Sequence, residues 1–148
     1  MTAPLRLVVD RGEDVVAMSL NLPSDLGLVG EAVELVARNC DTGVLSPRQL
    51  RFNLRTALAE ALANAIVYGN RRDISKLVRV AIELGRADVR ICVSDDGDGF
   101  DPAKIPDPTE PEHLHREDGR GLFVLRHLVD HVEFNERGNV VCLVLRAG

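Results

Sequence analysis

Glu60 and Asn64 stand four residues apart within Leu54–Asn70, a stretch whose apolar spacing predicts one continuous helix. Side chains four residues apart project from the same helix face, so this carboxylate and this amide point at one spot. An amide oxygen suits Mg²⁺, and a glutamate one turn earlier can orient or deprotonate a hydroxyl beside that metal. The alternative is a solvated helical glutamate and an asparagine that only satisfies a neighbouring backbone group.

A second set of residues follows directly on a predicted strand, in the order Asp95-Asp96-Gly97-Asp98-Gly99. Glycines at alternate positions permit backbone conformations and close approaches that side chains would block. An aspartate at a strand end can accept a hydrogen bond from an exocyclic amine such as that of adenine. The alternatives are an acidic turn or a calcium loop, but the preceding strand and the following proline fit the frame of an EF-hand poorly.

A third set, Gly119-Arg120-Gly121-Leu122, opens a predicted helix. The free N–H groups and the positive dipole end of a helix favour phosphate, and glycines allow that phosphate to come close. The alternative is an ordinary helix start after a loop. The three sets are therefore more informative in combination than singly.

The elements between these sets follow from hydrophobic period and turn residues. Asn53, Glu60 and Asn64 fall on one margin of the apolar stripe of their helix, where a helix can line a cleft. Gly69 is placed to end this helix in a left-handed cap, and Ser24 or Asp25 is the expected N-cap of the helix before it. The expected strands are residues 5–9, 15–22, 77–84, 89–93, 132–135 and 140–145, and the expected helices are residues 24–39, 46–69 and 119–129.

Composition restricts the class of protein. The 148 residues suit one domain, residues 1–148, with a well-buried core. A net charge of −5 without a dense basic run argues against nucleic-acid binding, and no apolar run is long enough to span a bilayer. Cys40, Cys92 and Cys142 lie far apart without metal-ligand spacing, which predicts buried, reduced thiols in a cytoplasmic protein.

The order of the three sets resembles the GHKL-type ATP-binding fold of sensor histidine kinases, gyrase-like ATPases and a class of heat-shock chaperones. Glu60 to Asn64 is similar to the N-box, Asp95 to Gly99 to the G1 box, and Gly119 to Gly121 to the G2 box that closes an ATP lid. The resemblance implies a Bergerat-type α/β two-layer sandwich. In this fold a mixed, mainly antiparallel sheet carries three helices on one face.

Within that superfamily, the chain length and the run FDP…PDPTEPEHL…GRGLFVLRHLVDHVEF look most like the anti-sigma factor serine/threonine kinases of bacteria. That resemblance implies Mg-ATP as cofactor, with Glu60 as the general base, Asn64 as the Mg²⁺ ligand and Asp95 as the adenine-binding carboxylate. The remaining nucleotide-binding residues that it implies are Gly97 and Gly99 in the adenine pocket and Gly119, Arg120, Gly121 and Leu122 in the lid motif. Glu117 departs from the family pattern, because it occupies the place of the first lid glycine.

Two functions are compatible with these residues. The first is an anti-sigma factor that sequesters a sigma factor and phosphorylates a serine of an anti-anti-sigma (STAS-type) protein. The second is an ATP-binding regulatory module that controls a partner without phosphotransfer, which Glu117 leaves open. A sensor histidine kinase is not expected, since all four histidines follow the first two motifs, and the resemblance also implies a homodimer through the first strands and first helix.

Overall fold

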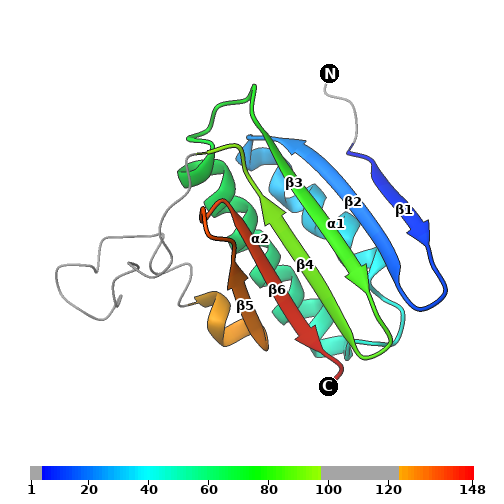
Figure 1. Ribbon diagram of the computed structural model, residues 1–148. Coiled ribbons are helices and arrows are strands. Elements are labelled where there is room, and N and C mark those ends of the chain that lie inside the picture. Colours follow the sequence, from blue (N-terminus) through cyan, green and yellow to red (C-terminus); the bar gives the residue numbers. More distant parts are fainter. Residues whose placement is uncertain (1–4, 98–123) are drawn as a thin grey trace.

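The computed structural model describes residues 5–97 and 124–148. Six strands form one sheet in the order β1-β2-β3-β4-β6-β5, and every neighbouring pair is antiparallel. The two long helices lie behind one face of this sheet, as Figure 1 shows. Residues 124–128 form a further helical turn, and its Leu125 and the following Val129 are buried in the same core. The predicted two-layer α/β architecture is confirmed.

The strands arise where buried and exposed side chains alternate, because successive side chains of a strand point to opposite faces. In β3, for example, Val78, Val80, Ile82 and Leu84 are buried, and the residues between them are exposed. All six expected strands are present, and consecutive strands pair antiparallel as β1 with β2, β3 with β4 and β5 with β6. The strands are β1 (Leu7–Arg11), β2 (Val16–Pro23), β3 (Leu77–Leu84), β4 (Asp88–Ser94), β5 (His131–Phe134) and β6 (Val140–Arg146).

The first helical segment begins at the predicted N-cap. Asp25 is extended, and its Oδ1 accepts the N–H of Gly27 at 2.9 Å, which satisfies one of the free donors at a helix start. A short 3₁₀ turn, η1 (Leu26–Leu28), leads into α1 (Val29–Asn39). The face of α1 that packs on the sheet consists of Ala32, Val33, Val36 and Ala37.

The second helix runs without a break through three segments, η2 (Gln49–Leu54), α2 (Arg55–Asn64) and η3 (Ala65–Gly69), and the outer two have π-helical turns. Its start is a reciprocal capping box. The Gln49 N–H donates to Ser46 Oγ at 3.1 Å, and the Ser46 N–H donates to Gln49 Oε1 at 2.8 Å. The predicted continuous helix over Leu54–Asn70 is therefore confirmed to Gly69.

The predicted left-handed cap at Gly69 is wrong. The left-handed residues are Arg71 and Arg72, with φ of 52° and 59°. The Arg72 N–H donates to the Ile66 carbonyl at 2.7 Å, so the chain after the helix folds back onto its last turn. Gly69 belongs to the last helical turn instead, and its missing side chain has a different use, described below.

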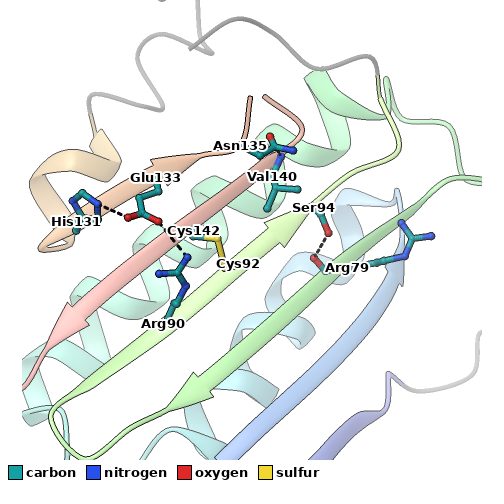
Figure 2. The surroundings of a disulfide bond; sticks show 9 residues. All are labelled: Arg79, Arg90, Cys92, Ser94, His131, Glu133, Asn135, Val140 and Cys142. Atoms are coloured by element: carbon teal, nitrogen blue, oxygen red, sulfur yellow. Dashed lines mark hydrogen bonds and ion pairs between the residues drawn. A yellow bond between two sulfur atoms is a disulfide. The ribbon is translucent and has the colours of Figure 1, made fainter. Parts of the chain in front are cut away.

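The prediction of three reduced thiols is also wrong. Cys92 and Cys142 form a disulfide, drawn in Figure 2, and only Cys40 is a free, buried thiol in the described part of the chain. The register of β4 and β6 places the two residues directly opposite one another, with 4.0 Å between their Cα atoms. Their side chains are partly exposed rather than buried in the core. Sequence spacing carries no information on such cross-strand contacts, which explains the error.

No helix in the described ranges is long and apolar enough to cross a membrane. That residues 1–148 form one domain stays a prediction.

Candidate functional site

The margin of the second helix carries the first predicted pair. Asn53, Glu60 and Asn64 are all half-buried, as expected for residues between the core stripe and solvent. The Asn53 amide donates to the Leu128 carbonyl at 2.9 Å and so ties this helix to residues 124–128. Within residues 5–97 and 124–148, no hydrogen bond or ion pair occupies the side chains of Glu60 and Asn64, so their oxygens are available to a ligand.

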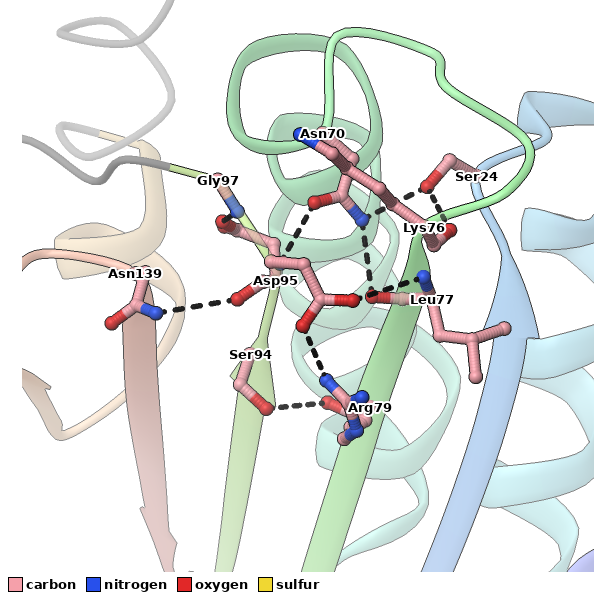
Figure 3. Close-up of polar contacts among 10 residues, drawn as sticks. Ser24, Asn70, Lys76, Leu77, Arg79, Ser94, Asp95, Gly97 and Asn139 are labelled. Carbon is pink, nitrogen blue, oxygen red and sulfur yellow. Dashed lines mark hydrogen bonds and ion pairs between the residues drawn. The ribbon is translucent and has the colours of Figure 1, made fainter.

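Asp95 directly follows the last residue of β4 and lies next to the end of the second helix, as Figure 3 shows. One carboxylate oxygen, Oδ1, accepts the N–H of Gly97 at 2.8 Å. Among the described residues, Gly97 is the only donor to this carboxylate. Asp95 therefore retains acceptor capacity next to Gly69, at the end of the helix that carries Glu60 and Asn64.

Two glycines make room for this carboxylate. A Cβ on Gly69 would lie 2.3 Å from the Asp95 Oδ2, and a Cβ on Gly97 would lie 2.0 Å from the Gly69 carbonyl oxygen. Real Cβ atoms do not come this close, so both positions must lack a side chain for the helix end, the carboxylate and the following turn to pack together. The structure shows that Gly97 has no room for a side chain, and its predicted role in an adenine pocket stays a prediction.

The environment of Asp95 is unusual for a carboxylate. Partial burial, followed by the charge of Asp96, raises the pKa of Asp95 above its ordinary value, against the opposing effects of the Gly97 N–H, Arg137 and Lys76. A partly desolvated acceptor with free capacity is suited to bind an amine of a ligand, since hydrogen bonds gain strength where water is excluded.

The neighbouring carboxylate is bound to the protein instead. Asp96 Oδ1 accepts from Arg79 at 2.7 Å, and its Oδ2 accepts the Leu77 N–H at 3.3 Å. The Arg79 hydrogen bond lowers the pKa of Asp96. On the other side, the Asp95 N–H donates to the Asn139 carbonyl at 3.0 Å, and the Asn139 amide donates to the Asp95 carbonyl at 3.3 Å. The backbone around Asp95 is thus held by both adjacent strands.

The structure brings together only part of the predicted site. Glu60 and Asn64 share one helix margin, and Asp95 and Gly97 adjoin the end of that helix. Gly99, Glu117, Gly119, Arg120, Gly121 and Leu122 lie outside the described residues, so their roles stay predictions.

Sequence reasoning missed Gly69 and Asn139 as residues of this site. The sequence did mark Gly69, but as a helix cap, because its close approach to Asp95 depends on how the helix packs on the sheet. Nothing in the local sequence indicates Asn139.

A metal site made by the protein alone is not present in the described part of the chain, where no three His, Cys, Asp or Glu residues cluster suitably. Around Asp95 the described residues offer one partly buried polar acceptor, with glycines where the backbone comes close.

Comparison with known protein families identifies the family of the chain. Residues 22–145 match the model of the histidine kinase-like ATPase domain. The chain belongs to this family. The match covers both helices and β3, β4, β5 and most of β6, and it includes the N-box-like pair and the Asp95–Gly97 turn.

Individual relatives are more specific. A serine-protein kinase RsbW of Oceanobacillus iheyensis is 29% identical over 62% of this chain and 62% of its own length. An anti-sigma F factor of Clostridium beijerinckii is 31% identical over 64% of this chain and 68% of its own length. An anti-sigma F factor of Bacillus cereus is 30% identical over 54% of this chain and 56% of its own length. These relatives confirm the resemblance to anti-sigma factor serine kinases. The matches span about two thirds or less of each relative.

Proposed function

We propose that this protein is an ATP-dependent protein serine kinase that acts as an anti-sigma factor. It sequesters a sigma factor in the cytoplasm and phosphorylates a serine of an anti-anti-sigma, STAS-type protein. The observation that carries the proposal is the partly buried Asp95 carboxylate, whose one donor among the described residues is the Gly97 N–H. It packs against Gly69 at the end of the helix that presents Glu60 and Asn64. The names of the relatives support the partners and the reaction.

The residues present fit adenine. The Asp95 carboxylate offers an acceptor to the exocyclic amine, and Gly69 and Gly97 give it the room it needs beneath the helix end. The lid glycines Gly119 and Gly121, with Arg120 and Leu122, complete the site in the proposal by contacting the phosphates.

The residues of the helix margin fit the metal and the transfer step. Asn64 supplies an amide oxygen for Mg²⁺, which neutralises phosphate charge when bound. Glu60 accepts the proton of the incoming serine hydroxyl, with its carboxylate free of other partners in the described structure. Binding of Mg-ATP therefore requires Asn64, whereas phosphotransfer requires both residues. The implied homodimer belongs to the same proposal.

Two substitutions test this division of roles. We expect Asn64→Ala to abolish Mg-dependent ATP binding in calorimetry, because it removes the metal ligand. We expect Glu60→Gln to bind ATP normally but to transfer labelled phosphate to a candidate anti-anti-sigma partner at least about a hundredfold more slowly, since general bases contribute about 10²–10⁴-fold. Thr56→Ala, on an exposed position of the same helix, is the control and should behave like the wild type.

Normal Mg-ATP binding by Asn64→Ala contradicts the metal assignment. Full transfer by Glu60→Gln contradicts the general base. A wild-type protein that binds ATP but labels no serine favours the second function, a regulatory module without phosphotransfer. The presence of Glu117 in the sequence favours this second function, because a carboxylate at the place of the first lid glycine would repel phosphate.

A further inference from the structure

Asn70 is the most deeply buried polar residue beside the proposed adenine site, with 0% of its surface exposed. It follows Gly69 directly and lies at the end of the second helix. A buried amide is costly unless its donors and acceptor are satisfied, so each of its bonds constrains the surrounding chain. The bonds of Asn70 reach three separate segments.

The amide nitrogen of Asn70 donates twice. It donates to Ser24 Oγ at 2.9 Å, just after β2, and to the Leu77 carbonyl at 3.1 Å, at the start of β3. Ser24 Oγ in turn donates to the Lys76 carbonyl at 2.7 Å, which leaves it an acceptor toward Asn70. Figure 3 shows this chain of contacts. Because Ser24 Oγ and the Leu77 carbonyl are both acceptors toward Asn70, the nitrogen of the amide must lie on their side.

The amide oxygen of Asn70 consequently faces the other way, and it accepts the N–H of Asp96 at 2.8 Å. Asp96 stands between Asp95 and Gly97, and the Gly97 N–H binds the Asp95 carboxylate. The bond from Asn70 therefore holds the middle residue of this turn. The main chain of Asn70 is itself fixed, because its N–H donates to the Ala65 carbonyl at 2.8 Å. The link from helix to turn is therefore rigid at both ends.

We propose that Asn70 is a positioning residue for base recognition: through the Asp96 N–H it sets the direction in which Asp95 presents its carboxylate to an adenine amine. This inference rests on the proposed nucleotide function of Asp95. Asn139 holds the same turn from β6, by bonds to the backbone of Asp95, but its side chain makes the longer contact. The Asn70 contact is shorter, at 2.8 Å, and it comes from a residue that is itself fully buried.

The test compares affinities for ADP and for inosine diphosphate, which carries a carbonyl in place of the adenine amine. The wild type should prefer ADP, because ionised Asp95 accepts from the amine and meets no donor on the carbonyl. In Asn70→Ala we expect the ADP preference to fall about tenfold, in line with the loss of one well-aligned hydrogen bond. Ser24→Ala is the matched control, because it removes a buried partner of the Asn70 nitrogen and spares the bond between the Asn70 oxygen and the Asp96 N–H. Its preference for ADP over inosine diphosphate should stay within about twofold of the wild-type value.

The ratio of affinities separates positioning from stability, because a partly unfolded sample loses affinity for both nucleotides equally. If the wild type prefers ADP and Asn70→Ala prefers it to the same extent, the inference about Asn70 is overturned and the proposed role of Asp95 stands. A wild type that binds neither nucleotide, or both equally, overturns the proposed role of Asp95 and the inference with it.

If Asn70→Ala does not fold, the wild type still decides. A through-hydrogen-bond NMR coupling between the Asp96 amide and the Asn70 side-chain carbonyl, with slow exchange of that amide, is the expected result. An Asp96 amide that exchanges as fast as an exposed one contradicts the inference.

Discussion

At the scale of single residues, Asp95 and Asp96 show how two adjacent carboxylates acquire different uses. The pKa of Asp95 is raised, chiefly by burial, whereas the pKa of Asp96 is lowered, chiefly by its hydrogen bond with Arg79. Ionised Asp96 is therefore stabilised by the fold, and that stability is lost as the pH falls through its folded-state pKa. Ionised Asp95 destabilises the fold, and stability is lost as the pH rises through its folded-state pKa. Of the two carboxylates, only Asp96 is stabilised by its protein contacts, and Asp95 is the one to which the proposed function assigns the adenine amine.

Asp95→Asn should raise the melting temperature of the ligand-free protein at neutral pH and weaken ADP binding. The amide keeps an oxygen for the Gly97 N–H but carries no charge to desolvate. The melting temperature is therefore expected to rise, because the desolvation that raises the pKa of Asp95 destabilises its ionised form in the folded protein. The difference should disappear below the ordinary pKa of 3.8, where Asp95 is protonated in both states.

Thermal melts between pH 3 and pH 8 measure this effect, with calorimetry of ADP on the same samples. Asp96→Asn is the control, and its melting temperature at neutral pH should fall, because it loses the charge that pairs with Arg79. A melting temperature of Asp95→Asn that is equal to or below the wild-type value at neutral pH would contradict the role of desolvation at Asp95.

At the scale of elements, the sequence predicted what is periodic and missed what depends on contacts between distant segments. The alternation in residues 77–84 and the apolar stripe of the second helix were sufficient, because a period of 2 or 3.6 is a property of one segment. Glu60, Asn64, Asp95 and Gly97 could be chosen because their types and spacing are local. The contact of Gly69 with Asp95 arises only when the helix packs on the sheet, and the local sequence is that of an ordinary cap.

Gly69→Ala should therefore destabilise the protein and weaken nucleotide binding together. The added methyl would lie 2.3 Å from the Asp95 carboxylate, so the helix end or the turn must move. Overpacking of this kind costs about 1–3 kcal/mol. Gly30→Ala is the control: Gly30 lies exposed in α1 with nothing within 4 Å of an added Cβ.

Gly30→Ala should stabilise the protein, by up to about 1 kcal/mol, because alanine is the better helix former. Urea unfolding of both variants, with ADP binding at a low denaturant concentration, measures the contrast. Equal stability and equal ADP affinity for Gly69→Ala and the wild type would show that the helix end does not contact Asp95 as described.

At the scale of the whole molecule, the sandwich connects the proposed site to the far side of the sheet. Asp95 follows β4, whose other face carries the Cys92–Cys142 disulfide to β6, next to the Arg90–Glu133 ion pair (Figure 2). This bond spans a sequence separation of 50 residues, within which residues 98–123 carry the predicted lid motif. Closing so long a loop restricts the unfolded chain, which stabilises the fold without any new contact at the site.

Reduction of this disulfide should lower the free energy of unfolding by about 4 kcal/mol, the loop-closure value for about 50 residues. Urea unfolding with and without a thiol reductant measures the difference. Cys40 does not interfere, because burial raises the pKa of its thiol to about 12 and so keeps it protonated. The double variant Cys92→Ser/Cys142→Ser should unfold like the reduced wild type and should not respond to reductant. If the wild type has the same urea midpoint in both conditions, β4 and β6 are held by their hydrogen bonds alone, and the original expectation of three reduced thiols is restored.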